Sequence, residues 1–118
     1  MARVLVVDDD TAALEIRKRI LERNGHQVFI AADADSARLC FSEAQPAVVV
    51  LDLRLPKASD GRALIREFRA SSADTRIVVL CGFAADLDGR PERALVDAVL
   101  EKPIRSEQLL AAILTSDS

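Results

Sequence analysis

The chain has 118 residues, half of them hydrophobic, and a formal net charge of −3. This length fits one compact domain, and the acidic balance argues against a nucleic-acid-binding surface, which would need clustered Lys and Arg. No apolar run approaches the roughly 20 residues of a membrane span, and the first residues lead into a strand pattern without a signal peptide.

Five short apolar segments are typical of strands. The first, third and fourth are nearly continuous in aliphatic and β-branched residues, which indicates strands buried on both faces, as in a parallel sheet. The fifth is the weakest of them. In chain order the predicted strands are Arg3 to Val7, Gln27 to Ala31, Ala47 to Leu51, Arg76 to Leu80 and Ala98 to Leu100.

Helical patterns separate these strands. Thr11 is predicted to cap the first helix, and Asn24-Gly25 to end it. The third helix is predicted from about Gly61 to Ala70, and the last one begins near Ser106. The side chains expected to face the core are Ala13, Ile16 and Ile20, then Ala37, Cys40, Phe41 and Ala44, then Leu64, Ile65 and Phe68, and finally Leu109, Leu110, Ile113 and Leu114.

The stretch between the fourth and fifth strands is the least regular part of the chain. Gly89 and Pro91 interrupt any helical pattern there, although Pro91 suits the first turn of a short helix. With a helix assumed in this stretch, a strand and a helix alternate five times. That alternation predicts an α/β domain with a doubly wound sheet and helices on both of its faces.

Side chains of types found in functional sites follow four of the predicted strands: Asp8-Asp9-Asp10, Asp52, Cys81-Gly82 and Glu101-Lys102-Pro103. In doubly wound folds the functional site lies at the carboxyl ends of the strands. Carboxylates gathered there repel each other unless a cation sits between them, and Mg²⁺ is a cation that prefers oxygen ligands. A carboxylate can also attack phosphorus, so the pattern favours phosphoryl transfer to a carboxylate.

Over its whole length the sequence resembles the receiver domains of two-component response regulators. The segments that carry the resemblance are VLVVDDD at 4–10, VVVLDLRLP at 48–56, DGRALIREFR at 60–69, IVVL at 77–80 and EKPI at 101–104. The resemblance implies one receiver domain over residues 1–118. It also implies a flavodoxin-like five-stranded parallel sheet with strand order 2-1-3-4-5.

The resemblance implies a metal site as well. Asp8 and Asp9 would form an acidic pocket for Mg²⁺, and Asp52 would be both a metal ligand and the phosphoacceptor. The backbone carbonyl of Arg54 would be a further contact to the metal. These residues are therefore the expected Mg²⁺ site.

The same resemblance assigns the residues around the phosphoryl group. Lys102 would pair with it, next to a cis Lys102-Pro103 peptide, and Cys81 and Gly82 would bind it from the fourth strand. The donor would be a phosphohistidine of a sensor histidine kinase or of a histidine phosphotransfer protein in the cytoplasm. The domain would catalyse only its own phosphorylation and dephosphorylation, and the modification would change its contacts with an output partner.

Two residues depart from the family pattern. Cys81 stands where the family usually has Thr or Ser, and a thiol is a weaker hydrogen-bond donor than a hydroxyl. Val99 stands where an aromatic ring often turns inward on activation. We expect phosphorylation to persist, its coupling to loop movement to be weaker, and the surface around the fourth helix and fifth strand to be atypical.

Two other functions remain open. A receiver-like interaction module that ignores phosphorylation is favoured by Cys81 and Val99. A Mg²⁺-dependent phosphatase would carry a second Asp two residues after its nucleophile, and Arg54 at that place cannot donate a proton.

Some of these residues also have plain interpretations. Asp10 is equally a helix cap, and Cys40 and Cys81 are expected to be reduced thiols of a cytoplasmic protein. Met1 favours, weakly, a complete single-domain regulator over a fragment of a larger protein.

Overall fold

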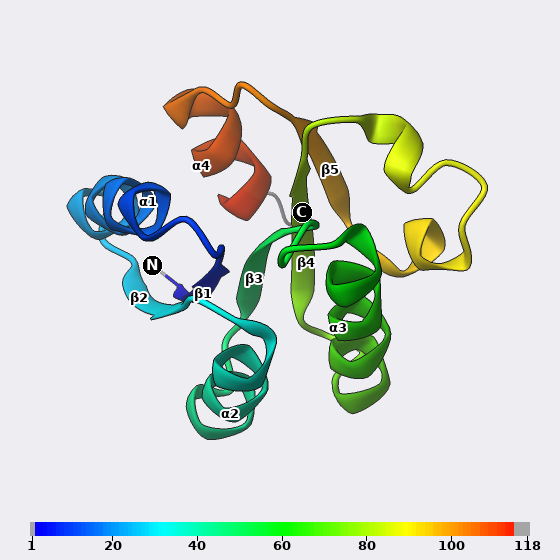
Figure 1. The fold of residues 1–118 in the computed structure, drawn as a ribbon. Coiled ribbons are helices and arrows are strands. Elements are labelled where there is room, and N and C mark those ends of the chain that lie inside the picture. Colours follow the sequence, from blue (N-terminus) through cyan, green and yellow to red (C-terminus); the bar gives the residue numbers. More distant parts are fainter. Residues whose placement is uncertain (1, 115–118) are drawn as a thin grey trace.

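Five strands form one parallel sheet in the computed structural model, which describes residues 2–114 (Figure 1). Each strand pairs in parallel with its neighbours, in the order β2-β1-β3-β4-β5. The predicted doubly wound fold and strand order are thus confirmed. The strands are β1 (Arg3–Val7), β2 (Gln27–Ala31), β3 (Val48–Asp52), β4 (Arg76–Cys81) and β5 (Ala98–Glu101), and the helices are α1 (Thr11–Arg23), α2 (Ala34–Ala44), α3 (Ala58–Ser71) and α4 (Ser106–Leu114).

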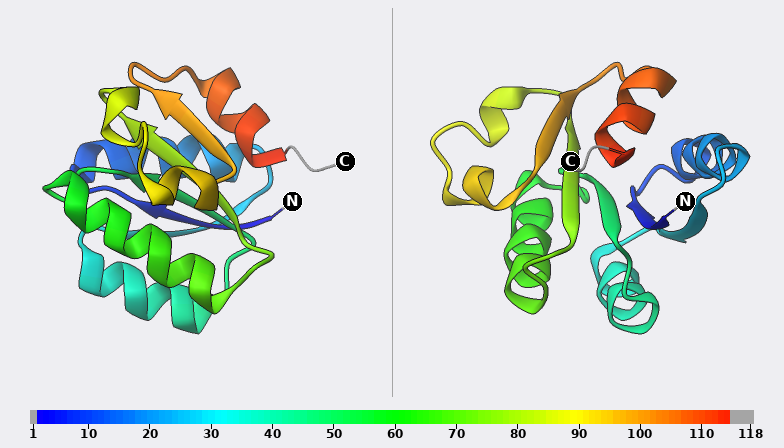
Figure 2. Two further views of the ribbon diagram at one scale, coloured as in Figure 1. Left: turned by 90° about the vertical axis from the view of Figure 1, so that its right-hand side faces the viewer. Right: turned by 180° about the vertical axis from the view of Figure 1, so that it is seen from behind.

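The helices cover both faces of the sheet, with α1 and α4 on one face and α2 and α3 on the other (Figures 1 and 2). Side chains alternate along each strand, so each face has its own apolar cluster. Val50 packs with Leu14 and Leu109 beneath α1 and α4, whereas Val49 packs with Phe68 on the side of α2 and α3. Within residues 2–114 no helix is long and apolar enough to cross a membrane.

The N-cap and the buried face of α1 differ from the prediction. Asp10, not Thr11, is its N-cap, because the Asp10 carboxylate accepts hydrogen bonds from the backbone of Ala12 and Ala13. Leu14 and Leu21 form its buried face, while Ile16, expected in the core, is 59% exposed. The prediction of Ile16 as a core residue is therefore wrong.

The other helices follow the predictions more closely. Ala37 and Ala44 of α2 are buried, and Leu64, Ile65 and Phe68 of α3 fill the core as expected. The third helix begins three residues before Gly61, at Ala58, because Asp60 in its first turn accepts a hydrogen bond from the backbone of Lys57. In α4 the prediction of Leu114 as a core residue is wrong, since Leu114 is exposed and Ala112 is buried instead.

Gly61 allows α3 to lie directly on the chain that follows β3. A methyl group at this position would stand 2.0 Å from the carbonyl oxygen of Leu53 and 2.7 Å from two further backbone atoms of Leu53. No ordinary contact between heavy atoms is that short, so only glycine fits here. Because Leu53 follows Asp52 directly, this contact also fixes the end of β3.

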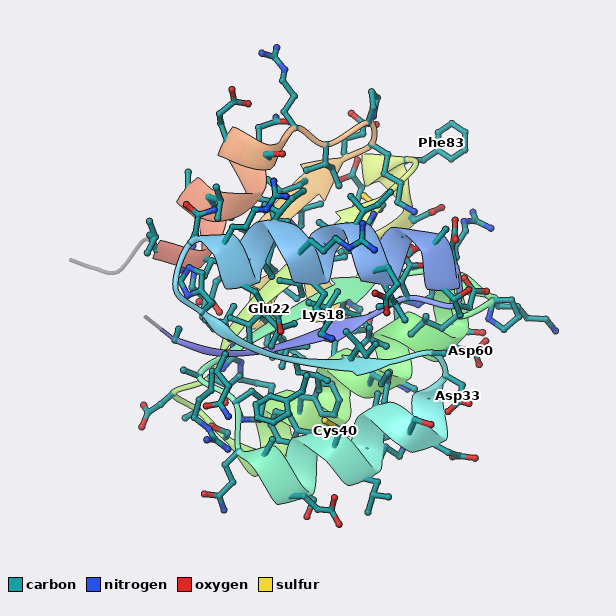
Figure 3. All side chains as sticks on the ribbon, turned by 90° about the vertical axis from the view of Figure 1, so that its left-hand side faces the viewer. Lys18, Glu22, Asp33, Cys40, Asp60 and Phe83 are labelled. Carbon is teal, nitrogen blue, oxygen red and sulfur yellow. The ribbon has the colours of Figure 1, made fainter. Side chains whose placement is uncertain are left out.

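Residues 82–97, which we name the crossover segment, contain no α-helix. Two short 3₁₀ helices, η1 (Ala84–Asp86) and η2 (Pro91–Leu95), replace the fourth of the five helices that the strand–helix alternation predicted. Pro91 starts η2, as predicted, and Gly89 adopts a positive φ of 71° between the two helices. Phe83, just before η1, projects from the surface of the domain (Figure 3).

Three ion pairs fasten the crossover segment to the β3–α3 side of the domain. Arg54 pairs with Asp86, Arg66 with Glu92, and Arg69 with Asp97. The Arg69 guanidinium also donates hydrogen bonds to the backbone carbonyls of Ser72, Thr75 and Leu95. These charged contacts act together with Leu87 and Val96, whose buried side chains anchor the segment in the core.

The single histidine should make the fold weaker in mild acid. Nδ1 of buried His26 accepts a hydrogen bond from the backbone of Ala2, at 3.1 Å, which requires a neutral ring nitrogen. Burial lowers the pKa of His26 below its usual 6.5. Between the lowered pKa of His26 in the folded chain and its usual value of 6.5, the unfolded chain binds more protons than the folded one. The free energy of unfolding therefore falls as the pH drops below about 6.5. His26→Asn keeps an acceptor without titrating, so urea unfolding at several pH values should give a flatter profile for this variant; an unchanged profile would assign the effect to other groups.

Candidate functional site

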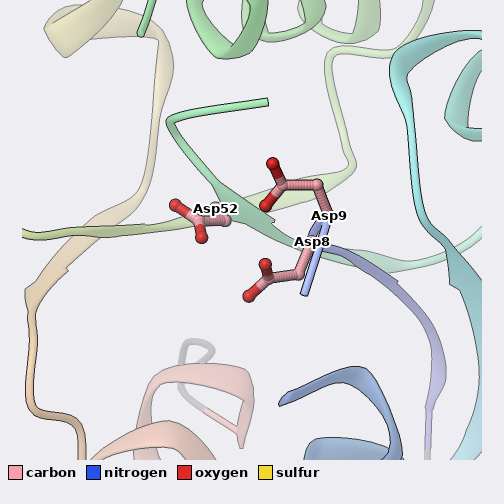
Figure 4. A group of neighbouring side chains, drawn as sticks. All are labelled: Asp8, Asp9 and Asp52. Atoms are coloured by element: carbon pink, nitrogen blue, oxygen red, sulfur yellow. The ribbon is translucent and has the colours of Figure 1, made fainter. Parts of the chain in front are cut away.

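Three carboxylates converge at the carboxyl end of the sheet. Asp8 and Asp9 directly follow β1, Asp52 is the last residue of β3, and these strands are neighbours in register, with Val7 beside Leu51. One carboxylate oxygen from each residue lies within 4.8 Å of the other two (Figure 4). Asp8 and Asp52 are 1% and 6% exposed, whereas Asp9 is open to solvent.

Lys102, which directly follows β5, completes the cluster. Its Nζ donates a hydrogen bond to Oδ2 of Asp52 at 2.8 Å, and its backbone N–H bonds the carbonyl of Cys81 at 2.8 Å. The second oxygen of Asp52 accepts a hydrogen bond from the backbone of Arg54, at 3.3 Å. The Lys102-Pro103 peptide is cis, as predicted, and Leu55-Pro56 is cis as well.

The environment of Asp52 disfavours its negative charge. Burial raises the pKa of Asp52, and the nearby charge of Asp8 raises it further, whereas the hydrogen bond from Lys102 lowers it. A cation beside the two buried carboxylates would relieve both the repulsion and the loss of hydration. The electrostatics of the cluster therefore favour a bound cation.

The donor set fits Mg²⁺ in particular. Asp8, Asp9 and Asp52 offer only hard carboxylate oxygens, and the exposed side of Asp9 leaves room for the water ligands that Mg²⁺ retains. Neither cysteine belongs to this group of acidic residues, so residues 2–114 give it no soft ligand of the kind that zinc or copper favours. The residues present therefore fit a hard divalent cation such as Mg²⁺.

A second cation, which the sequence analysis missed, reaches the site from α1. Arg17 forms an ion pair with Oδ2 of Asp8. The signal was present in the sequence, because Leu14, Arg17 and Leu21 share one face of a helix at spacings of three and four.

The remaining predicted site residues lie around this cluster. Cys81 ends β4 and is buried in the apolar cluster on the side of α2 and α3, and Gly82 beyond it is exposed. Burial raises the pKa of the Cys81 thiol, so this thiol is protonated at neutral pH. The Arg54 side chain is turned toward Asp86 of η1, at 3.1 Å, and Val99 is half-buried in β5.

The sequence and the fold both match known receiver domains. The family model described as response regulator receiver domain matches residues 4–114. The response regulator MprA of Mycolicibacterium vanbaalenii is 38% identical over 114 residues, which cover 92% of this chain and 47% of MprA. MprA of Mycobacterium avium is 37% identical, and the match covers 48% of its length. The chain therefore spans about half the length of the curated relatives it matches.

Solved receiver domains have the same fold. A receiver domain from Methanospirillum hungatei superposes with a TM-score of 0.87 at 30% identity, covering 96% of this chain and 90% of that one. A signal receiver domain from Bermanella marisrubri gives a TM-score of 0.82 at 36% identity, and the match covers 94% of this chain and 93% of that one.

Proposed function

Because the chain belongs to the family of response regulator receiver domains, we propose that it accepts a phosphoryl group on Asp52 and passes this signal to an output partner. The donor is a phosphohistidine of a sensor histidine kinase or of a histidine phosphotransfer protein. Asp8, Asp9, Asp52 and the backbone carbonyl of Arg54 hold one Mg²⁺ ion. Residues 1–118 act as one receiver domain, which catalyses only its own phosphorylation and dephosphorylation.

The observation that carries this proposal is the contact of Asp52 with Lys102 inside the acidic cluster. In the transfer step an oxygen of Asp52 attacks the phosphorus, and the bond from phosphorus to the histidine nitrogen breaks with its electrons left on the imidazole. The Lys102 ammonium, 2.8 Å from Oδ2 of Asp52, pairs with the oxygens of the arriving phosphoryl group. Bound Mg²⁺ supplies further neutralisation of those oxygens.

The signal consists of added charge at the end of β3. Phosphorylation gives Asp52 about one more negative charge, next to the backbone of Arg54. The side chain of Arg54 connects to η1 through Asp86, so the crossover segment is the part of the fold that responds. We place the output contact on that segment, where the domain departs most from a regular βα repeat.

Other parts of the proposal concern location and partners. The two cysteines are free thiols, which fits a reducing cytoplasm. The net charge of −3 argues against binding of nucleic acid by these residues. That remains a prediction, since the match covers only 47% of the relative MprA, and the rest of MprA lies outside it.

A small acyl phosphate tests the function directly. The chain is incubated with this donor and Mg²⁺, and its intact mass is measured. We expect the gain of one phosphoryl group, and no gain when a chelator removes the metal. No gain at saturating Mg²⁺ would instead favour an interaction module that ignores phosphorylation, and steady release of phosphate from phosphomonoesters would favour a phosphatase.

Replacing Cys81 tests how strongly phosphorylation reaches the crossover segment. We expect Cys81→Thr to take up phosphate like the parent chain, because residue 81 is neither nucleophile nor metal ligand. The hydroxyl is a better donor to a phosphoryl oxygen than a buried thiol, so phosphorylation should shift the amide resonances of residues 83–97 more in this variant. Cys81→Val has nearly the same shape as Thr without the hydroxyl, and it should behave like the parent; equal shifts in all three proteins would show that residue 81 has no part in the coupling.

A further inference from the structure

Arg17 is a charged side chain that nothing in the phosphoryl-transfer chemistry explains. It extends from the second turn of α1 to Asp8, and its guanidinium donates to Oδ2 of that carboxylate. The other oxygen, Oδ1, accepts a hydrogen bond from the backbone of Asp10 at 2.9 Å. Both oxygens of Asp8 therefore already have partners within the chain.

The position of Arg17 makes this contact more than a surface ion pair. Arg17 lies between Leu14 and Leu21 on the buried face of α1, and its side chain is only 16% exposed. The Asp8 side chain is 2% exposed. A largely buried guanidinium without a partner would cost free energy, so Arg17 at this position depends on its ion pair with Asp8.

Arg17 also changes the charge of the metal site. Three carboxylates with Lys102 and Arg17 leave a formal charge of −1, whereas the same site without Arg17 would carry −2. The affinity of an oxygen site for a divalent cation rises with its negative charge. An arginine at this place therefore opposes the binding of Mg²⁺.

We propose that Arg17 is an internal counter-ion that competes with Mg²⁺ for Asp8. It stabilises the buried carboxylate when no metal is bound, and it must release Oδ2 before that oxygen can ligate a metal. Arg17 thus sets the concentration of Mg²⁺ at which the domain becomes competent for phosphorylation. This role rests on the proposed function, because it assumes that Asp8 is a ligand of Mg²⁺.

Calorimetric titration with Mg²⁺ tests the role without any phosphoryl transfer. We expect Arg17→Gln to bind Mg²⁺ about tenfold more tightly than the parent chain, which is the effect of one charge near a divalent ion. Arg17→Met, which suits the apolar neighbours Leu14 and Leu21, should show the same gain. Arg17→Lys keeps the charge and should stay close to the parent. Arg19→Gln makes the same change of charge on the exposed side of α1 and serves as the matched control.

Thermal unfolding gives a second readout. Arg17→Gln should unfold at a lower temperature than the parent in the presence of a chelator, and Mg²⁺ should raise its unfolding temperature by more than it raises that of the parent. Equal or weaker Mg²⁺ binding by Arg17→Gln and Arg17→Met would overturn the role of Arg17 while leaving the proposed function intact. Absence of Mg²⁺ binding in every variant and in the parent would overturn the proposed function itself.

Discussion

The variant Asp52→Asn is expected to take up no phosphoryl group from a small acyl phosphate in the presence of Mg²⁺. A carboxamide has no anionic oxygen with which to attack phosphorus. It also removes one of the three carboxylates of the metal site and leaves Lys102 only a neutral oxygen as its acceptor at this position. Its intact mass after incubation should equal that of a sample without donor.

The matched control for this variant is Asp10→Asn. It makes the same chemical change two residues after Asp8, but the Asp10 side chain caps α1 and contacts the backbone of Ala12 and Ala13. Asparagine caps helices about as well as aspartate, so this variant should be phosphorylated like the parent chain. A full phosphoryl gain by Asp52→Asn would place the acceptor on another residue.

Gly61→Ala is expected to cost about 3 kcal/mol of unfolding free energy, a large part of the roughly 5–15 kcal/mol of a typical domain. The added methyl group would stand 2.0 Å from the carbonyl oxygen of Leu53, and backbone atoms cannot turn aside as a flexible side chain can. Either α3 or the end of β3 must move. Since Asp52 precedes Leu53, we also expect slower phosphorylation in the fraction that stays folded.

Urea unfolding followed by circular dichroism measures this loss, because the chain has no Trp or Tyr for fluorescence. Alanine is normally the better residue inside a helix, by about 1 kcal/mol over glycine. Ala63→Gly, the reverse change two residues further along α3, should therefore cost about that amount and calibrate the helical contribution. Greater stability of Gly61→Ala than of the parent would show that α3 does not contact Leu53 so closely.

The sheet and its acidic edge could be predicted because both depend on short stretches of sequence. Buried parallel strands are continuous apolar runs, and the residues that follow them, Asp8 and Asp52, must meet at one edge once the strand order is given. The orientation of α1 could not be predicted in the same way. The apolar side chains of Ala13, Ile16 and Ile20 suggest one buried face, and only the packing against the sheet selects Leu14 and Leu21 instead.

Contacts between residues that are far apart in the sequence could not be predicted either. Arg54 and Asp86 are separated by 32 positions, and nothing in either neighbourhood indicates that they pair. Gly89 and Pro91 did mark the crossover segment as irregular. They could not show that ion pairs with Arg54, Arg66 and Arg69 would hold the segment in place of a helix.

The way in which the crossover segment is held makes it a separate unit for local opening. Ion pairs at a protein surface contribute only about 0–1 kcal/mol each, and the arginines of two of the three pairs, Arg54 and Arg66, are more than half exposed. Opening of residues 82–97 must also withdraw the buried side chains of Leu87 and Val96 from the core. The segment nevertheless contains neither an α-helix nor a strand, so its amide protons should exchange with solvent earlier than those of β3. Dissolved salt screens such ion pairs. A higher ionic strength should therefore increase how often residues 82–97 open.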